Sequence, residues 1–328
     1  MEKPDPIRHV AVVGTGLIGG SWAALFLAQG LDVTAADPAP GAEKSLRESV
    51  DRAWPILEQL GLKAGASRNR LRFTPDPAEA VARADFVQES GPERAEFKVG
   101  LFAQLDRATP AGAILASSSS GLKMSVIQSG CANPGRCVIG HPFNPPHVIP
   151  LVEVVGGERT SPETIERAMA FYSSIGKHAI HVRREVRGHV ANRLQAALWR
   201  EAVHLVAEGV VSVADVDAAV AQGPGLRWGV MGPNLILHLG GGRGGMRHFM
   251  DHLSGPFESW WADLGNPVLT PELKVALIDG VEEEAAGRSV EELERERDRL
   301  LLGLIALRGG PQGGPSDQSS SVTKRGSP

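Results

Sequence analysis

Residues 9–20 read His9-Val10-Ala11-Val12-Val13-Gly14-Thr15-Gly16-Leu17-Ile18-Gly19-Gly20. This apolar run ends in the pattern G-x-G-x-x-G and leads directly into a helix-periodic apolar segment. The order predicts a strand, a tight turn at Gly14 and a helix, with Gly16 open to a pyrophosphate and Gly19 allowing close helix–strand packing. N–H groups at the start of the helix favour phosphate. We therefore predict that Gly14, Gly16, Leu17, Ile18 and Gly19 bind a dinucleotide; a glycine-rich turn without a nucleotide is the alternative.

The next strand pattern ends in an acidic residue. It reads Leu31-Asp32-Val33-Thr34-Ala35-Ala36-Asp37, and Asp37 follows Gly14 by 23 residues. A carboxylate at about this distance from the first glycine accepts hydrogen bonds from the ribose hydroxyls of a bound dinucleotide. Its charge also repels the 2′-phosphate of NADP. The predicted cofactor is therefore NAD, with Asp37 among its contacts.

The composition excludes several other classes of protein. The chain has 328 residues, 42% of them apolar, and its net charge of −4 offers no positive surface to nucleic acid or an anionic membrane. Its two cysteines are too few for a disulfide framework and lack a zinc spacing, so we predict no metal site. No apolar run approaches the ~20 residues of a membrane span, and no signal-like stretch follows the N-terminus. We expect a soluble, cytoplasmic protein.

Strand and helix patterns alternate early in the chain and later give way to helices. The alternation predicts an α/β fold over residues 1–186, a Rossmann-type doubly wound parallel sheet that forms the NAD-binding domain. From Val190 onward apolar residues recur every three or four positions, which predicts an all-helical domain over residues 187–308. The segment 309–328 is rich in Gly, Pro and Ser and is predicted to be a disordered tail. Three predicted helices begin with a capping side chain: Asp76, Ser161 and Ser212.

Several segments, in this order along the chain, resemble the 3-hydroxyacyl-CoA dehydrogenase superfamily. They are the Gly14 motif, Glu89 to Lys98, Ser117 to Ser120, His141-Pro142-Phe143-Asn144-Pro145 followed by Leu151-Val152-Glu153-Val154, and Gly188 to Arg193 at the hinge into the helical domain. The resemblance covers residues 8 to 308. It implies an NAD-dependent enzyme that oxidises the 3-hydroxyl of a small molecule and forms a homodimer through its helical domain.

Oxidation of a secondary alcohol requires a base whose pKa lies near neutrality, and histidine suits that task. His141 directly follows a buried strand pattern, and ligands of open α/β folds bind at the carboxyl ends of strands. Glu153 lies in the next strand pattern, where a carboxylate beside the imidazole would fix its tautomer. The resemblance likewise implies that His141 is the catalytic base and Glu153 its partner. A histidine that merely ends a strand is the alternative.

Five more residues match positions of the family's active site. Ser120 and Asn192 match groups that hydrogen-bond the substrate oxygen, and Asn144 matches a further substrate position. Glu93 and Lys98 match positions near the nicotinamide ribose of the cofactor. The alternatives are an ordinary polar turn at Ser120, a helix cap at Asn192 and a surface helix pair of Glu93 and Lys98.

A second set of segments resembles the branch of the superfamily that oxidises L-carnitine. The set comprises Lys63 to Ser67, Gly121-Leu122, Gly156 to Thr160, Leu198 to Ala202, Leu226 to Trp228 and Gly244 to Met250. A trimethylammonium group favours aromatic faces, and the helical domain offers Trp199, Trp228, Phe249, Phe257, Trp260 and Trp261. Ordinary packing would explain each of these side chains equally well. Arg193 and Lys123 are both candidates for the substrate carboxylate.

Other substrates and roles stay open at this point. A 3-hydroxyacyl-CoA and L-gulonate, as in the lambda-crystallin relatives, are the alternative substrates. A non-catalytic NAD-binding protein is an alternative of a different class. Two positions also depart from the family pattern: His189 stands where an aromatic or aliphatic residue is usual, and His147 where close relatives often have an aromatic one.

Overall fold

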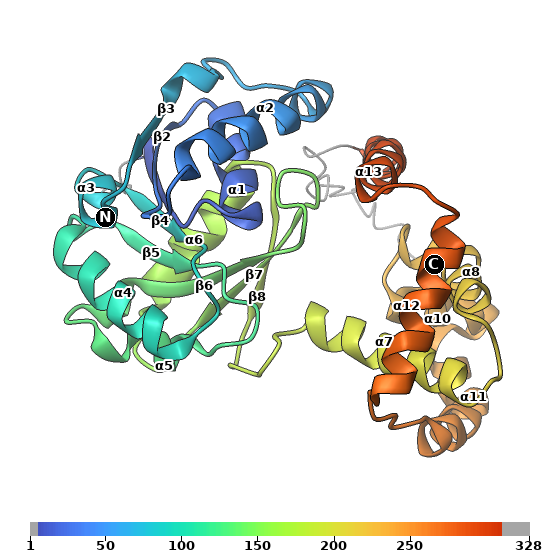
Figure 1. The fold of residues 1–328 in the computed structure, drawn as a ribbon. Helices are drawn as coiled ribbons and strands as arrows, with labels where there is room; N and C mark the ends of the chain where they lie inside the picture. The colour runs from blue at the N-terminus through green and yellow to red at the C-terminus, as the bar shows by residue number, and fades with distance from the viewer. Residues whose placement is uncertain (1–5, 310–328) are drawn as a thin grey trace, which may run out of the picture. The chain divides into compact units, whose positions relative to one another are not determined.

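The computed structural model describes residues 6–309, which form two compact units (Figure 1). The first, here called the sheet unit, contains the residues up to His189 together with those from Ile305 onward. The second, the helical unit, is Val190–Leu304. The predicted disordered tail lies outside the described residues except for Gly309. Over residues 6–309, no helix has both the length and the apolar character needed to cross a bilayer.

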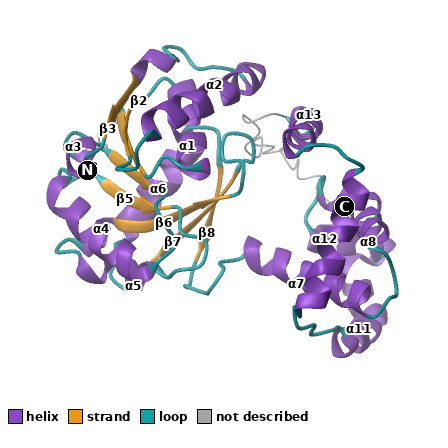
Figure 2. Ribbon diagram, viewed as in Figure 1, coloured by secondary structure: helices purple, strands orange, loops and turns teal. Residues whose placement is uncertain are grey.

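The sheet unit is built on one sheet, whose strands are drawn in orange in Figure 2. It has eight strands in the order β3-β2-β1-β4-β5-β6-β7-β8. Its strands are His9–Val13 (β1), Asp32–Ala36 (β2), Leu71–Thr74 (β3), Phe86–Glu89 (β4), Ile114–Ser117 (β5), Cys137–Pro142 (β6), Leu151–Gly156 (β7) and His178–Val182 (β8). The strand order reverses between β1 and β4, and such a reversal is where nucleotides bind in doubly wound sheets. The predicted Rossmann-type fold is confirmed.

Two strands, β7 and β8, run against the predicted direction. All neighbouring strands are parallel except β6 and β7, which are antiparallel. A parallel return needs a crossover of about a dozen residues or more, whereas only residues 143–150 separate β6 from β7. The antiparallel register sets His141 directly opposite Glu153.

Helices cover both faces of the sheet. They are Leu17–Ala28 (α1), Ala42–Leu60 (α2), Pro77–Val81 (α3), Ala95–Ala108 (α4), Met124–Ile127 (α5) and Pro162–Ser174 (α6). One core cluster joins Val10 and Val12 of β1 to side chains of α1, α2 and α6, and another joins Ala11 and Val13 to side chains of α4 and α5. Successive side chains of a strand point to opposite faces, so β1, which is covered on both, is apolar along most of its length.

The helical unit contains the remaining helices: Ala191–Ala207 (α7), Val213–Gln222 (α8), Pro224–Trp228 (α9), Pro233–Gly240 (α10), Gly245–Asp263 (α11), Pro271–Ala285 (α12) and most of Val290–Leu307 (α13). Its core is small. Val203, Val213, Val216 and Phe249 are buried, whereas α12 and α13 bury no residue.

The three predicted helix caps are present. The side chain of Asp76 accepts a hydrogen bond from the Ala78 N–H, and that of Ser161 accepts one from the Thr164 N–H. Ser212 caps α8 in the same way through the Asp215 N–H. Each cap satisfies a backbone donor that the first turn of a helix leaves unpaired.

Candidate active site

The glycine turn joins β1 to α1 and leaves room beside one of its glycines. Gly14 has φ +90°, and a Cβ there would lie 2.7 Å from the carbonyl carbon of Ser90. A Cβ on Gly19 would lie 1.8 Å from the carbonyl oxygen of Gly14. The protein's own packing therefore requires both glycines. Gly16, the N-cap of α1, has extended backbone, and a Cβ on it would meet nothing within 4 Å among the described residues.

The Asp37 carboxylate follows β2 and is held against this turn. Its Oδ2 accepts hydrogen bonds from the backbone N–H of Thr15 at 2.8 Å and from the Thr15 hydroxyl at 3.2 Å. Its Oδ1 accepts one from the Ala39 N–H at 3.0 Å. An ionised carboxylate has about four acceptor positions, so capacity remains for a ligand hydroxyl. Phe73 and Pro75 line a depression that also includes Asp37.

His141 and Glu153 form a buried pair across β6 and β7. The Nδ1 atom of His141 lies 2.8 Å from Oε2 of Glu153, whose side chain is 0% exposed. Because an ionised carboxylate only accepts hydrogen bonds, Nδ1 of the neutral imidazole carries the proton. The other nitrogen, Nε2, then has a lone pair with which to accept a proton. The arrangement holds a base in one tautomer and orientation.

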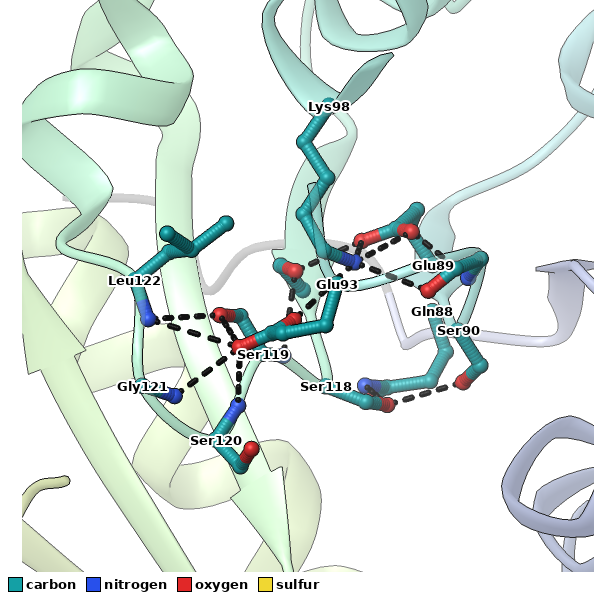
Figure 3. A network of polar contacts seen from close by, with 12 residues as sticks. Gln88, Glu89, Ser90, Glu93, Lys98, Ser118, Ser119, Ser120, Gly121 and Leu122 are labelled. Carbon is teal, nitrogen blue, oxygen red and sulfur yellow. Dashed lines mark hydrogen bonds and ion pairs between the residues drawn. The ribbon is translucent and has the colours of Figure 1, made fainter. Parts of the chain in front are cut away.

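Glu93, in the loop after β4, holds the turn that follows β5 (Figure 3). Its Oε1 accepts hydrogen bonds from the Ser119 hydroxyl at 2.6 Å and from the backbone N–H groups of Ser120 at 3.0 Å and Gly121 at 2.9 Å. Burial raises the pKa of the Glu93 carboxyl, but the hydrogen bonds and the charge of Lys98 outweigh it and hold this pKa below its ordinary value. Glu93 is therefore an ionised anchor for the turn.

Lys98 extends from α4 to the end of β4 and is buried there (Figure 3). Its Nζ lies 2.7 and 2.9 Å from the two carboxylate oxygens of Glu89, and 3.7 Å from Oε2 of Glu93. Glu89 also accepts a hydrogen bond of 2.6 Å from the Ser117 hydroxyl. The surface helix pair considered for Glu93 and Lys98 is wrong, because Glu93 precedes α4 and Lys98 is buried in an internal network at the ends of β4 and β5.

His189 packs against His141. The two ring centroids are 5.3 Å apart, and Nε2 of His189 lies 3.0 Å from the carbonyl oxygen of Ser119. Since a carbonyl only accepts hydrogen bonds, Nε2 is the donor. Burial lowers the pKa of His189, and nearby His141 lowers it further, while the bond to Ser119 and the charge of Glu153 oppose the shift without reversing it. His189 is therefore neutral at physiological pH.

Comparison with known proteins agrees with this geometry. Residues 9–186 match the family model described as the NAD binding domain of 3-hydroxyacyl-CoA dehydrogenase, and residues 188–266 match that of its C-terminal domain. The chain belongs to the 3-hydroxyacyl-CoA dehydrogenase family. The resemblance inferred from the sequence motifs is confirmed.

Among its relatives are several bacterial L-carnitine dehydrogenases. That of Streptomyces griseus is 54% identical over 306 residues, covering 93% of this chain and 91% of the relative. That of Bacillus cereus is 48% identical over 303 residues, covering 92% of this chain and 93% of the relative. A solved NAD+-dependent dismutase, FHMPC 5-dehydrogenase, superposes with a TM-score of 0.80 at 32% identity, covering 93% of this chain and 99% of that one. The (S)-3-hydroxybutyryl-CoA dehydrogenase of Ralstonia eutropha superposes with a TM-score of 0.60 at 27% identity, covering 66% of this chain and 77% of that one.

The glycine turn of this 3-hydroxyacyl-CoA dehydrogenase family member fits NAD. The space beside Gly16 lies at the N-terminus of α1, where backbone N–H groups and the helix dipole favour the diphosphate. The first turn of α1, with Leu17 and Ile18, contains no acidic side chain that would repel it. Asp37 lies beside the same turn, where its spare acceptor positions suit ribose hydroxyls. These residues would hold the cofactor.

The other predicted site residues lie in three different segments of this protein. Ser120 belongs to the turn anchored by Glu93, and Asn144 is an exposed residue of the loop between β6 and β7. Asn192 belongs to the helical unit, in the first turn of α7; Val190, not Asn192, is the N-cap there. The role of Asn192 stays a prediction. In the part of the chain that the structure describes, no three metal-ligating side chains are grouped.

Two residues near this site had no role assigned from the sequence. Glu89 lies within a segment recognised as a family motif, but its pairing with Lys98 depends on β4 ending beside α4. His189 was noted only as a departure from the hinge pattern. Its neighbours, Ser119 and His141, are 70 and 48 residues away in the chain, so no local pattern reveals the contact.

Proposed function

We propose that this protein oxidises the 3-hydroxyl of L-carnitine to 3-dehydrocarnitine with NAD. The observation that carries the proposal is the His141–Glu153 pair, a buried oriented base in the same sheet as a glycine turn open to a dinucleotide. The substrate is proposed from the relatives named L-carnitine dehydrogenase, which match nine-tenths of the chain. When bound, NAD supplies the hydride acceptor.

In this proposal each site residue has one task. Nε2 of His141 accepts the hydroxyl proton, and the Glu153 carboxylate stabilises the imidazolium that forms. Ser120 and Asn192 hydrogen-bond the reacting oxygen, where charge develops. Asn144 contributes a further polar group to the substrate. Glu93 and Lys98 lie near the nicotinamide ribose and keep the neighbouring turn in place.

The trimethylammonium end of the substrate is proposed to contact aromatic faces of the helical unit. Phe249 is buried and packs against Phe257, with ring centroids 5.4 Å apart. Trp199, Trp260 and Trp261 are more than half exposed, so their faces are the better candidates. A cation over a tryptophan gains about 0.5–2 kcal/mol, which favours L-carnitine over an uncharged 3-hydroxy acid.

We also propose that the protein is a homodimer assembled through its helical unit. Support comes from α12, whose exposed apolar residues Val275, Ile278 and Val281 lie along one side of the helix. Apolar stripes of this kind are normally covered by a partner. A cytoplasmic location remains a prediction from the composition.

Formation of NADH, followed by its absorbance, tests the proposed reaction. L-Carnitine, 3-hydroxybutyryl-CoA and L-gulonate are compared at matched concentrations, and we expect turnover with L-carnitine. Activity with only the CoA ester or only gulonate would replace the proposed substrate. No activity with any of them would favour the non-catalytic alternative.

The same assay tests the proposed base. His141→Gln should lower kcat by about 10²–10⁴-fold, the usual contribution of a general base. His181→Gln, which changes an exposed histidine of β8, is the matched control and should retain full activity. If both variants keep wild-type kcat, His141 is not the base.

A further inference from the structure

His189 and Glu93 hold the two ends of one peptide group. The Ser119–Ser120 peptide presents its carbonyl oxygen to Nε2 of His189 at 3.0 Å and its N–H to Oε1 of Glu93 at 3.0 Å. A peptide group is planar, so two hydrogen bonds at opposite ends fix its rotation about the chain. The orientation of this peptide determines the direction in which the chain enters Ser120.

We infer that His189 is a positioning residue for the proposed dehydrogenase reaction: it holds the Ser119–Ser120 peptide, and thereby Ser120, beside His141. The inference rests on the proposed function, in which Ser120 binds the reacting oxygen. It assigns a task to a residue that departs from the family's hinge pattern. A phenylalanine or an aliphatic side chain at position 189 has no N–H with which to hold the Ser119 carbonyl.

The surroundings of His189 indicate that the protein holds this side chain in a specific position. The residue is 2% exposed, and its backbone has φ +48°. Positive φ is uncommon for residues other than glycine and persists where the surrounding structure holds it. Its Nδ1 is buried, and the described residues offer this atom no hydrogen-bond partner. A buried acceptor left in this way costs about 1–3 kcal/mol, so the protein maintains the ring in this position at a cost.

The charge state of His189 suits the task. The titratable groups facing it are His141, Glu153 and Glu93. His141 and Glu153 are the proposed base and its partner, and Glu93 holds the turn. A neutral imidazole can donate one hydrogen bond to Ser119 without placing a second positive charge beside His141. A cation at this position would oppose protonation of His141 by the substrate hydroxyl.

Three substitutions separate the hydrogen bond from backbone strain. His189→Gln keeps an N–H at about the place of Nε2, whereas His189→Asn carries the same amide one methylene short of Ser119. His189→Phe keeps a ring without any N–H. Asn tolerates positive φ better than Gln or Phe, so strain alone would make the Asn variant the best of the three.

We expect kcat with L-carnitine to fall by about 10–100-fold in His189→Phe and His189→Asn, the effect of a small misplacement of a reacting group. His189→Gln should recover most of the loss, and the Kd of NAD should be unchanged in all three variants. The inference is overturned if His189→Phe has wild-type kcat, or if His189→Asn equals or exceeds His189→Gln. These comparisons are made in an active wild-type enzyme, so they are distinct from failure of the proposed reaction.

Amide hydrogen exchange gives a second measurement that needs no activity. The N–H groups of residues 120–122 should exchange faster in His189→Phe and His189→Asn than in the wild type, because the peptide is held at one end only. In His189→Gln the exchange should remain near the wild-type rate. Equal exchange in all four proteins would overturn the inference even if the substrate proves to be another 3-hydroxy acid.

Discussion

At His141, a single hydrogen bond determines which ring nitrogen is available for chemistry. Glu153→Gln preserves the size of the side chain but removes the charge that stabilises an imidazolium. We expect kcat to fall by about 10²–10⁴-fold, while the Kd of NAD, measured by fluorescence quenching, stays unchanged. Glu166→Gln on the exposed side of α6 is the matched control. Wild-type kcat in Glu153→Gln would show that the carboxylate does not assist the base.

The buried His189 should also make stability depend on pH. Its pKa is lowered in the folded protein, so the unfolded chain binds a proton first as the pH falls below about 6.5. Stability is fully present above that pH and is lost below it, by at most about 1.4 kcal/mol per pH unit for this one group. Urea unfolding between pH 7.5 and 5 should show a smaller loss in His189→Phe than in the wild type. Identical pH dependence in the two proteins would contradict a neutral buried His189.

The sequence predicted the chemical roles of single residues better than it predicted which side chains contact one another. The residue types at His141 and Glu153 and their positions in successive strands, together with the resemblance to the family's motifs, predicted the pair. Glu93 and Lys98 were expected together, yet the nearest partner of Lys98 is Glu89. Which of two acidic residues a lysine reaches depends on where α4 begins relative to β4, and that is a tertiary property.

At the scale of elements, local signals predicted starts and periods but not directions. A side chain such as Ser161 caps a helix through contacts within its first turn, so the sequence alone reveals it. The reversed direction of β7 and β8 was not predicted, because the residue pattern of a strand is the same in either direction. The short segment 143–150 was the available signal, since it cannot contain a crossover.

The strand–turn–helix unit around α1 allows one glycine to be tested against another. Gly16→Ala adds a methyl group where the described residues leave open space and the backbone is extended. We expect wild-type stability with a Kd of NAD raised by about tenfold or more, because the methyl group occupies the approach of the diphosphate. Calorimetry measures the NAD affinity and thermal unfolding the stability.

Gly19→Ala is the counterpart, since its Cβ would lie 1.8 Å from the Gly14 carbonyl oxygen. Helix and strand must separate to admit it, at a cost of about 3 kcal/mol or more. The two alanine variants should therefore differ: Gly16→Ala raises the Kd of NAD, and Gly19→Ala lowers the stability of the fold. If Gly16→Ala binds NAD as tightly as the wild type, the turn does not contact the diphosphate.

At the scale of the whole molecule, helical periodicity predicted the second unit but not what covers its apolar faces. Hydrophobic spacing shows which side of a helix seeks burial, and gives no information on whether the same chain or another one provides it. In the structure α12 buries no residue, and Val275, Ile278 and Val281 are 55%, 55% and 53% exposed. A second copy of the chain is the occupant we propose.

This assembly predicts a solution mass of about twice the 34.7 kDa of one chain, measured by light scattering. Ile278→Glu places a carboxylate in the proposed contact, and its desolvation should weaken the dimer by about 100-fold or more. Ala276→Glu is the control: it adds the same charge on the opposite side of α12, at a residue that is also exposed, and should leave the mass unchanged. A monomeric wild type, or a dimer that Ile278→Glu does not affect, would show that this stripe is not the interface. Both variants introduce the same carboxylate into α12, on opposite sides of the helix, so a selective loss of mass in Ile278→Glu assigns the contact to the side that carries the stripe.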